Sequence, residues 1–309
     1  MTRIALIATG GTIACTTTAD GSLVPTVSGA TLAANIDAEV VEFRQLDSSS
    51  ITLADLDELI AVVNAQTSRE DIDGVIITHG TDSMEETALA LEIFCSGAKP
   101  IVLTGAQRSY DHPAADGPSN LRDARDLAAS GRAGVFICFG GATIPARGAR
   151  KRHTSDLRGF ESLGIPGTTP RLAPAPLAPH PVEIIPAYPG AGRLLVDAAA
   201  TSPTCGLIIE AMGSGNMGED MGRALADALR TGLPVVISTR TPYGPTALAY
   251  GGDGGGASLG KLGAINAGSF RPSQARILLA AALATGTDPA ELFRVRNRPP
   301  GRALPGIGP

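Results

Sequence analysis

Two segments of the chain place hydroxyl side chains just after an apolar run and a glycine turn. Thr12 follows the run 4–8, and Thr81 with Asp82 follows the run 74–78. Ligands of open α/β sheets bind beyond the carboxyl ends of the strands, so we expect these three side chains in one crevice. Two hydroxyls and one carboxylate at such a place indicate covalent hydroxyl chemistry rather than cofactor binding.

A threonine hydroxyl is a weak nucleophile unless a base or an ammonium group assists its deprotonation. Asp82 is too short and too close in sequence to serve Thr81 as that base by itself. Lys151 lies in the basic segment 147–152 and is the candidate partner. A lysine buried beside hydroxyl and carboxylate groups can have a lowered pKa and can transfer protons.

The same strand–glycine–threonine pattern also occurs in phosphate-binding loops. The lysine that such a loop requires is absent after Thr12, which disfavours a nucleotide site there. The four cysteines are scattered and form no CxxC pair, so neither a metal site nor a disulfide framework is expected. We expect His79, at a strand end, to be a structural hydrogen-bonding residue rather than a general base.

Composition restricts the class of protein and its partners. The chain has 309 residues, 43% of them hydrophobic, and a net charge of −5. This charge disfavours a nucleic-acid or anionic membrane partner. No apolar run has the length of a membrane helix, and the N-terminal apolar run is too short for a signal peptide. The expected location is the cytoplasm.

Alternating strand and helix patterns predict an α/β protein with a mostly parallel, doubly wound sheet. Strand-like runs recur at 4–8, 40–46, 74–78, 100–104 and 134–139. Helical patterns lie between them at 52–65, 84–95 and 117–129. These elements form a larger catalytic domain, 1–165.

A second, smaller α/β domain is expected at 191–309, after a proline-rich linker at 166–190 that cannot be regular helix. Strand patterns at 206–210 and 233–238 and helical patterns at 220–231 and 273–284 belong to this domain. The tail after Arg294 is basic and proline-rich, which is typical of poorly ordered segments.

At this point the motifs themselves identify a family. The segments 9–14 and 79–87 closely resemble the two signature motifs of bacterial-type L-asparaginases and glutaminase-asparaginases. Further matches follow in the right order at 47–49, 115–121, Lys151 with 154–156, and 213–216. The resemblance covers nearly the whole chain.

The resemblance implies roles for the reactive side chains. Thr12 matches the nucleophile that attacks the side-chain amide and forms an acyl-enzyme. Thr81, Asp82 and Lys151 match a second triad that polarises a threonine or its water. No metal or organic cofactor is implied, because these groups and bound water are sufficient for hydrolysis.

The resemblance also implies a binding site for a small zwitterionic amide. Ser48 matches the residue that binds the α-carboxylate of the substrate, and Asp82 also matches the residue that pairs with its α-ammonium. Ser49 follows at a position where some members with glutaminase activity carry glutamine. Backbone groups of Gly11 and Ala115 would surround the amide.

The likeness further implies an assembly of several copies of the chain. Asn216, in the second domain, matches a residue that reaches the active site of a partner subunit. The expected state is therefore a homodimer or homotetramer with active sites at the intimate interface.

Three departures from the family pattern matter. Pro25 stands where members usually carry a tyrosine that activates the first threonine, and proline has no hydroxyl. The stretch 250–256 lacks the glutamate that some members place near that tyrosine. Ser83 replaces the usual threonine of the second motif and keeps the hydroxyl.

The resemblance therefore implies an amidohydrolase that converts L-asparagine to L-aspartate and ammonia. Two alternatives stay open. Ser49 leaves the length of the substrate undecided, so glutamine or a larger amide could be preferred. Pro25 also leaves room for a relative that binds asparagine without hydrolysing it, although the four reactive side chains argue against this.

Overall fold

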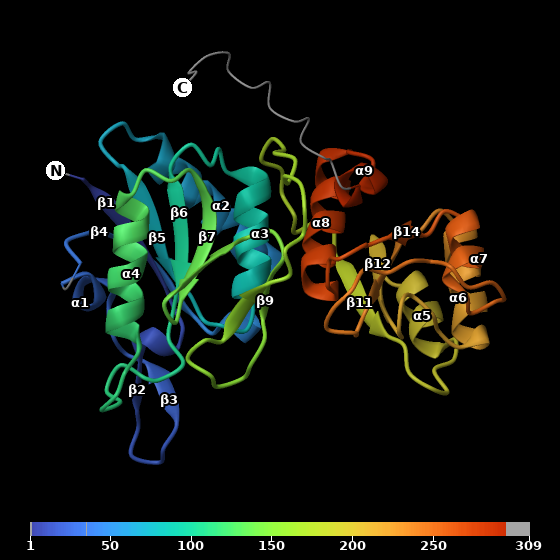
Figure 1. Ribbon diagram of the computed structural model, residues 1–309, viewed down its shortest axis with the longest axis horizontal. Coiled ribbons are helices and arrows are strands. Elements are labelled where there is room, and N and C mark those ends of the chain that lie inside the picture. Colours follow the sequence, from blue (N-terminus) through green and yellow to red (C-terminus); the bar gives the residue numbers. More distant parts are fainter. Residues whose placement is uncertain (1, 35, 295–309) are drawn as a thin grey trace, which may run out of the picture.

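A computed structural model describes residues 2–34 and 36–294 of the chain. The larger domain is built on a six-stranded sheet with the order β4-β1-β5-β6-β7-β8 (Figure 1). Its strands are β1 (Ile4–Gly10), β4 (Glu39–Leu46), β5 (Gly74–Thr78), β6 (Pro100–Thr104), β7 (Gly134–Phe139) and β8 (Ala142–Pro145). Five strands run parallel and β8 pairs antiparallel with β7. The predicted mostly parallel sheet is confirmed.

Helices cover both faces of this sheet, because successive side chains of each strand point to opposite sides. Ala5 and Ile7 pack with α2 and α3, whereas Ile4 and Leu6 pack with α1 and α4. The helices are α1 (Gly29–Ala33), α2 (Leu53–Ser68), α3 (Met84–Phe94) and α4 (Gly117–Ala129). Strands buried on both faces explain why they appear in the sequence as continuous apolar runs.

The strand order reverses between β1 and β5. The chain leaves β1 for its neighbour β4 on one side and then crosses to β5 on the other side. Such a switch point leaves a crevice at the carboxyl ends of the two strands. Thr12 follows β1 and Thr81 follows β5, so both threonines lie at this crevice.

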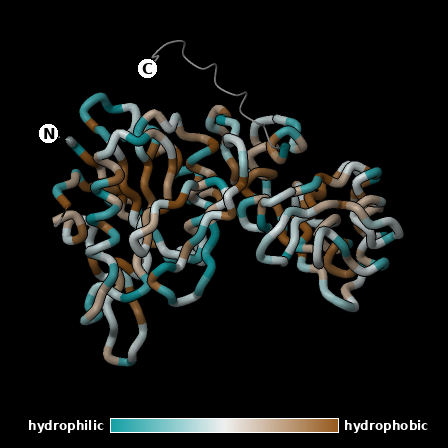
Figure 2. Tube along the Cα trace, in the orientation of Figure 1, coloured by the Kyte–Doolittle hydropathy of each residue, from teal (hydrophilic) through white to brown (hydrophobic). Residues whose placement is uncertain are grey.

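The smaller domain has a parallel sheet with the order β11-β12-β13-β14. Its strands are β11 (Val182–Pro186), β12 (Gly206–Ala211), β13 (Val235–Thr239) and β14 (Ile265–Asn266), and its helices are α5 (Leu194–Ala200), α6 (Glu219–Arg230), α7 (Gly256–Lys261), α8 (Pro272–Thr285) and α9 (Pro289–Phe293). Helix α8 packs on this sheet and also on α3 of the larger domain (Figure 1). One apolar core therefore extends across both domains. Figure 2 shows hydrophobic residues in the sheet regions of both domains.

Short elements account for the differences from the predicted pattern. The stretch expected as a linker, 166–190, contains β11, an edge strand whose prolines lie at its border, where no ladder bond is lost. Two small antiparallel sheets stand apart from the main sheets: β2 (Cys15–Thr17) with β3 (Leu23–Pro25), and β9 (Ala149–Lys151) with β10 (Phe160–Ser162). The domain boundaries stay predictions, and the tail 295–309 lies outside the described residues.

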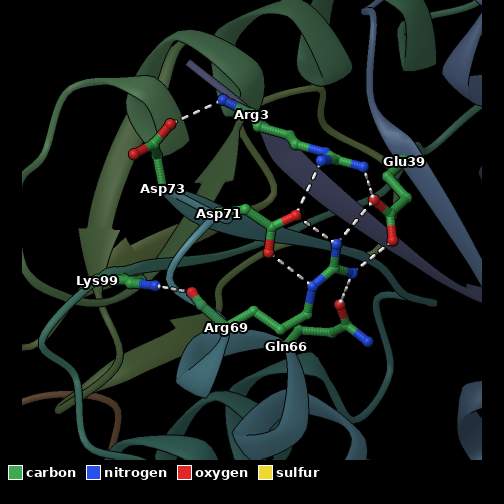
Figure 3. Close-up of polar contacts among 7 residues, drawn as sticks. All are labelled: Arg3, Glu39, Gln66, Arg69, Asp71, Asp73 and Lys99. Carbon is green, nitrogen blue, oxygen red and sulfur yellow. Dashed lines mark hydrogen bonds and ion pairs between the residues drawn. The ribbon is translucent and has the colours of Figure 1, made fainter. Parts of the chain in front are cut away.

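Charged side chains form a network at the amino ends of the strands of the large sheet, opposite the crevice at their carboxyl ends (Figure 3). Arg3 pairs with Glu39 and Asp71 at 2.8 Å each, and Arg69 pairs with the same two carboxylates. These side chains are one-third to one-half exposed, so the network contributes little stability per pair. The charged cluster is thus a surface feature remote from the two threonines.

Candidate active site

Three backbone turns meet in close contact at the crevice. A side chain on Gly11 would place its Cβ 2.5 Å from the backbone nitrogen of Gly80, and Gly11 also has a φ of 82°. A Cβ on Gly80 would lie 2.4 Å from the Ser48 Oγ. Real Cβ atoms do not approach other atoms so closely, so Gly11 must be glycine and a side chain at position 80 would displace that of Ser48. The turns after β1, β4 and β5 are therefore packed directly against one another.

The three turns border a cavity of about 350 Å³, a volume typical of small-ligand sites. Its walls come from the turns, the β2–β3 hairpin, the loop after β6, and β9 with the loop that follows it. The lining residues are Gly11, Thr12, Cys15, Leu23, Pro25, Leu46, Asp47, Ser48, Gly80, Thr81, Asp82, Gln107, Lys151 and Thr154. The four candidate reactive side chains thus share one cavity.

Lys151 links the two polar groups that follow β5. Its Nζ donates to the Thr81 Oγ1 at 2.7 Å and to the Asp82 Oδ1 at 2.7 Å. Thr81 is buried, the Lys151 side chain is 21% exposed, and the Asp82 side chain is 59% exposed. The ammonium is therefore held on a buried hydroxyl by a carboxylate that faces the solvent side of the cavity.

Ser48 is buried and belongs to the short 3₁₀ turn Ser48–Ser50 that follows β4. Its Oγ accepts from the backbone N–H of Asp82 at 3.2 Å, which leaves the hydroxyl hydrogen free to donate to a ligand. The hydroxyl of Ser83 donates to the Ser48 backbone oxygen at 2.6 Å. The serine at position 83 thus uses its hydroxyl to join the two turns.

His79 is completely buried beneath the cavity and does not line it. Its Nδ1 lies 2.7 Å from the Gly80 backbone oxygen, and its Nε2 lies 3.0 Å from the Thr87 hydroxyl. Burial lowers the pKa of the imidazole to about 4. A neutral ring with both nitrogens bonded agrees with the structural role expected for His79.

The β2–β3 hairpin covers one side of the cavity with apolar groups. Leu23 and Pro25 both line it, and Pro25 is paired in register with Cys15. Neither residue has a hydroxyl that could deprotonate Thr12. Burial, together with the charge of Asp47, raises the pKa of the Cys15 thiol, so that thiol is a poor base at neutral pH.

Three of the residues expected to bind substrate lie outside this cavity. Ser49 lines a neighbouring pocket together with Thr52 and Glu86, and Ala115 lies in the loop before α4. Asn216 lies in the smaller domain, where its backbone pairs with Met212. The structure of one chain therefore gathers Gly11, Ser48 and the four reactive residues but not these three.

Three polar side chains of the cavity had no role assigned from the sequence: Gln107, and Asp47 and Thr154, which fall in the matched segments 47–49 and 154–156. Gln107 follows β6, the strand next to β5, and Thr154 lies three residues after Lys151. The signal for Gln107 was available, because the carboxyl ends of neighbouring parallel strands lie at the same edge of a sheet. The Gln107 side-chain amide donates to the Asp156 backbone oxygen at 3.0 Å, which ties the loop after β9 to this edge.

The glycines at 213, 215 and 218 match the GxGxxG spacing between β12 and α6, which is typical of dinucleotide sites. The start of α6 does not suit a phosphate. Glu219 and Asp220 occupy its first turn, and the backbone of Asp253 packs directly against Gly222. Within 2–34 and 36–294, no cluster of three or more histidine, cysteine, aspartate or glutamate residues has the geometry of a metal site.

Family comparisons cover most of the chain. Residues 3–170 match the model described as "Asparaginase, N-terminal", and residues 181–295 match "Glutaminase/Asparaginase C-terminal domain". A probable L-asparaginase of Deinococcus radiodurans is 35% identical over 95% of this chain and 96% of its own length. Both domains are therefore similar to the corresponding domains of these proteins.

Solved structures agree with this comparison over the whole fold. A probable cytoplasmic L-asparaginase from Campylobacter jejuni superposes with a TM-score of 0.84 at 28% identity, covering 95% of this chain and 99% of that one. The thermostable L-asparaginase from Thermococcus kodakarensis gives a TM-score of 0.81 at 26% identity, covering 96% and 97%. Among the helices that the structure describes, none combines the length and the hydropathy needed to cross a membrane.

Proposed function

The chain belongs to the asparaginase family, and from this premise we propose that it hydrolyses the side-chain amide of L-asparagine to L-aspartate and ammonia. The observation that carries the proposal is the contact of Lys151 with Thr81 and Asp82 in the cavity that Thr12 also lines. An ammonium held on a hydroxyl beside a second hydroxyl is suited to acyl transfer through an oxygen nucleophile.

The reaction takes place in two halves. The Thr12 oxygen attacks the amide carbon, the proton of its hydroxyl is transferred to the amide nitrogen, and the C–N bond then breaks as ammonia leaves. Water, polarised by Thr81 and Lys151, attacks the resulting ester and releases aspartate and the Thr12 hydroxyl. Backbone N–H groups at the Gly11 turn are suited to stabilise the oxyanion of each step.

Substrate recognition follows from the polar groups of Asp82 and Ser48, which both line the cavity. Asp82 uses its Oδ1 for Lys151, which leaves its Oδ2 to accept from the α-ammonium of the substrate. Ser48 offers its hydroxyl hydrogen to the α-carboxylate. These two groups select a zwitterionic amino acid over a simple amide.

We also propose that the active enzyme is a homodimer or homotetramer in the cytoplasm. Asn216, which does not line the cavity of its own chain, would then contribute to the cavity of a second copy. Light scattering of the purified protein tests the assembly, and Asn216→Ala should raise the KM for asparagine. A fully active monomer would contradict the shared site.

The test of the function is ammonia release from L-asparagine and L-glutamine, measured side by side at micromolar and millimolar substrate. Faster release from asparagine supports the proposal. Faster release from glutamine would mean that the longer amide is the main substrate. A second candidate function, binding without hydrolysis, is favoured by the missing hydroxyl at Leu23 and Pro25. Asparagine binding in calorimetry without ammonia release would establish that alternative.

A further inference from the structure

The backbone of Lys151 is held by a buried carboxylate that takes no part in the reaction proposed above. The Lys151 N–H donates to the Glu85 Oε2 at 2.5 Å, and Glu85 is only 8% exposed. Alternate amides of an antiparallel strand point away from its partner, and this one points away from β10. Within the described ranges, Glu85 is the acceptor found for this N–H.

The smaller domain is hydrogen-bonded to the second oxygen of the same carboxylate. Ser273, at the start of α8, donates its hydroxyl to the Glu85 Oε1. The Gln274 side-chain amide donates to the backbone oxygens of Glu85 at 3.1 Å and Ala146 at 2.8 Å, and its oxygen accepts from the Gly148 N–H at 2.9 Å. Helix α8 is therefore hydrogen-bonded both to the first turn of α3 and to the loop that leads into β9.

This support adds to the burial of Ala149 in the apolar core and to the pairing of β9 with β10. Strand β9 is only three residues long, and it pairs with β10 in a sheet separate from the main one. By contrast, Thr81 and Asp82 precede Glu85 in one short segment that joins β5 to α3. One carboxylate thus sets the position of β9 relative to the two groups that the Lys151 ammonium must reach.

We propose that Glu85 is the positioning residue of Lys151, and that Ser273 and Gln274 make the smaller domain part of this support. The inference rests on the proposed function, since it assigns Lys151 a role in turnover. Misplacing a catalytic group by about 1 Å can cost about 10²-fold in rate. Loss of Glu85 should therefore slow the reaction without removing any group that touches the substrate.

The energetics of the buried carboxylate are consistent with this role. Burial raises the pKa of Glu85, and the hydrogen bonds from Ser273 and the Lys151 amide, with the charges of Arg150 and Lys151, oppose that rise. A buried carboxyl group that is kept between two donors is costly to leave unpaired. The site therefore resists any movement of β9 or α8 away from Glu85.

The first test compares two substitutions at one position. Glu85→Ala should lower kcat for asparagine by about 10²-fold and change KM much less. Glu85→Gln should restore most of the rate, because its amide oxygen can accept from the Lys151 N–H while its NH₂ group donates to the Ser273 Oγ. Glu219→Ala is the matched control, a first-turn glutamate of α6 that is 78% exposed, and it should leave kcat unchanged.

Ser273→Ala is a milder variant for the case in which Glu85→Ala does not fold. It should lower kcat with KM unchanged, by less than Glu85→Ala does. Combined with Glu85→Ala it should add little further loss, because the two residues act through the same contact. A Ser273→Ala enzyme with the wild-type kcat would show that the smaller domain does not help to position Lys151.

A measurement independent of turnover separates this inference from the proposed function. Hydrogen exchange of the Lys151 amide should be faster in Glu85→Ala than in wild type, whereas exchange in β5 should not change. Unchanged exchange at Lys151, or wild-type kcat in folded Glu85→Ala, would overturn the inference. A wild-type protein that releases no ammonia would instead overturn the function, and the exchange experiment would still decide whether Glu85 holds β9.

Discussion

The ammonium of Lys151 lies 2.7 Å from the hydroxyl of Thr81, although 70 positions separate the two residues in the chain. Lys151 approaches from a small two-stranded sheet, whereas Thr81 follows a central strand of the large sheet. Holding a strongly hydrated ammonium on a buried hydroxyl costs desolvation free energy, and the neighbouring carboxylate of Asp82 compensates its charge. This contact is the centre of the site.

Replacing Lys151 tests whether the contact is catalytic. Lys151→Met should lower kcat by at least about 10²-fold, as expected for the loss of a proton-transfer group. The stability should fall by no more than about 1 kcal/mol, because the partner carboxylate of Asp82 is 59% exposed. Lys99→Met, at the opposite edge of the sheet, is the matched control and should keep full activity. An active Lys151→Met enzyme would exclude the proposed triad.

The assignment of the nucleophile has its own test. Mass spectrometry after a brief pulse of asparagine and acid quenching should find an acyl adduct on the peptide that contains Thr12. Thr12→Ala should lack the adduct and release no ammonia above background, while Thr81→Ala should lose turnover with the fold intact. An adduct on Thr81 instead would exchange the roles of the two threonines.

Close packing of Gly80 on Ser48 predicts a binding defect. Gly80→Ala places a methyl group 2.4 Å from the Ser48 Oγ and must displace that side chain. We expect a higher KM for asparagine with a smaller change in kcat, and a stability loss of about 1–3 kcal/mol from overpacking. Gly192→Ala, where a Cβ meets no atom within 4 Å, is the control for the loss of a glycine. Equal KM values for the two variants would contradict the role of Ser48.

The hairpin over the cavity predicts a gain of activity. Pro25→Tyr introduces a phenol at a cavity-lining position and should raise kcat if deprotonation of Thr12 limits the reaction. Leu23→Tyr is the companion variant, because Leu23 lines the same wall. No increase in either variant would mean that another group already performs this step, and Thr154 would then be the next residue to replace.

The buried His79 and the partly buried Glu86 predict opposite effects of pH on stability. Burial lowers the pKa of His79 from 6.5 to about 4, so between these values only the unfolded chain binds the proton. The stability associated with His79 is complete above pH 6.5 and decreases by about 3 kcal/mol as the pH falls to 4. In urea unfolding, the amount by which His79→Gln is less stable than wild type should therefore decrease as the pH falls from 6.5 to 4.

Glu86 works in the other direction. Burial and the nearby Glu85 raise its pKa from 4.5 to about 7, so the folded chain binds the proton more tightly. Its contribution to stability is largest below pH 4.5 and is lost as the pH rises to 7. Glu86→Gln should gain stability relative to wild type over that rise. A pH-independent difference between either variant and wild type would contradict the corresponding pKa.

Much of the architecture could be predicted because its signals are local. The central strands of both sheets, such as β1, β5 and β13, are buried on both faces and appear as continuous apolar runs. The helix Gly117–Ala129 has the predicted bounds. Shorter elements were missed. Strands β9 and β11 have three and five residues, and prolines border β11, so neither shows a periodic pattern that could predict it.

What the sequence alone determined was the family, the reactive residue types and the two strand–turn segments that carry Thr12 and Thr81, because each depends on neighbouring residues. Which distant groups meet depends on how the folded elements pack. The contact of Lys151 with Thr81, its support by Glu85 and Ser273, and the hairpin that brings Leu23 and Pro25 over the cavity all join segments that are far apart in the chain. Such contacts depend on how separate elements pack, and no local pattern of residues encodes them.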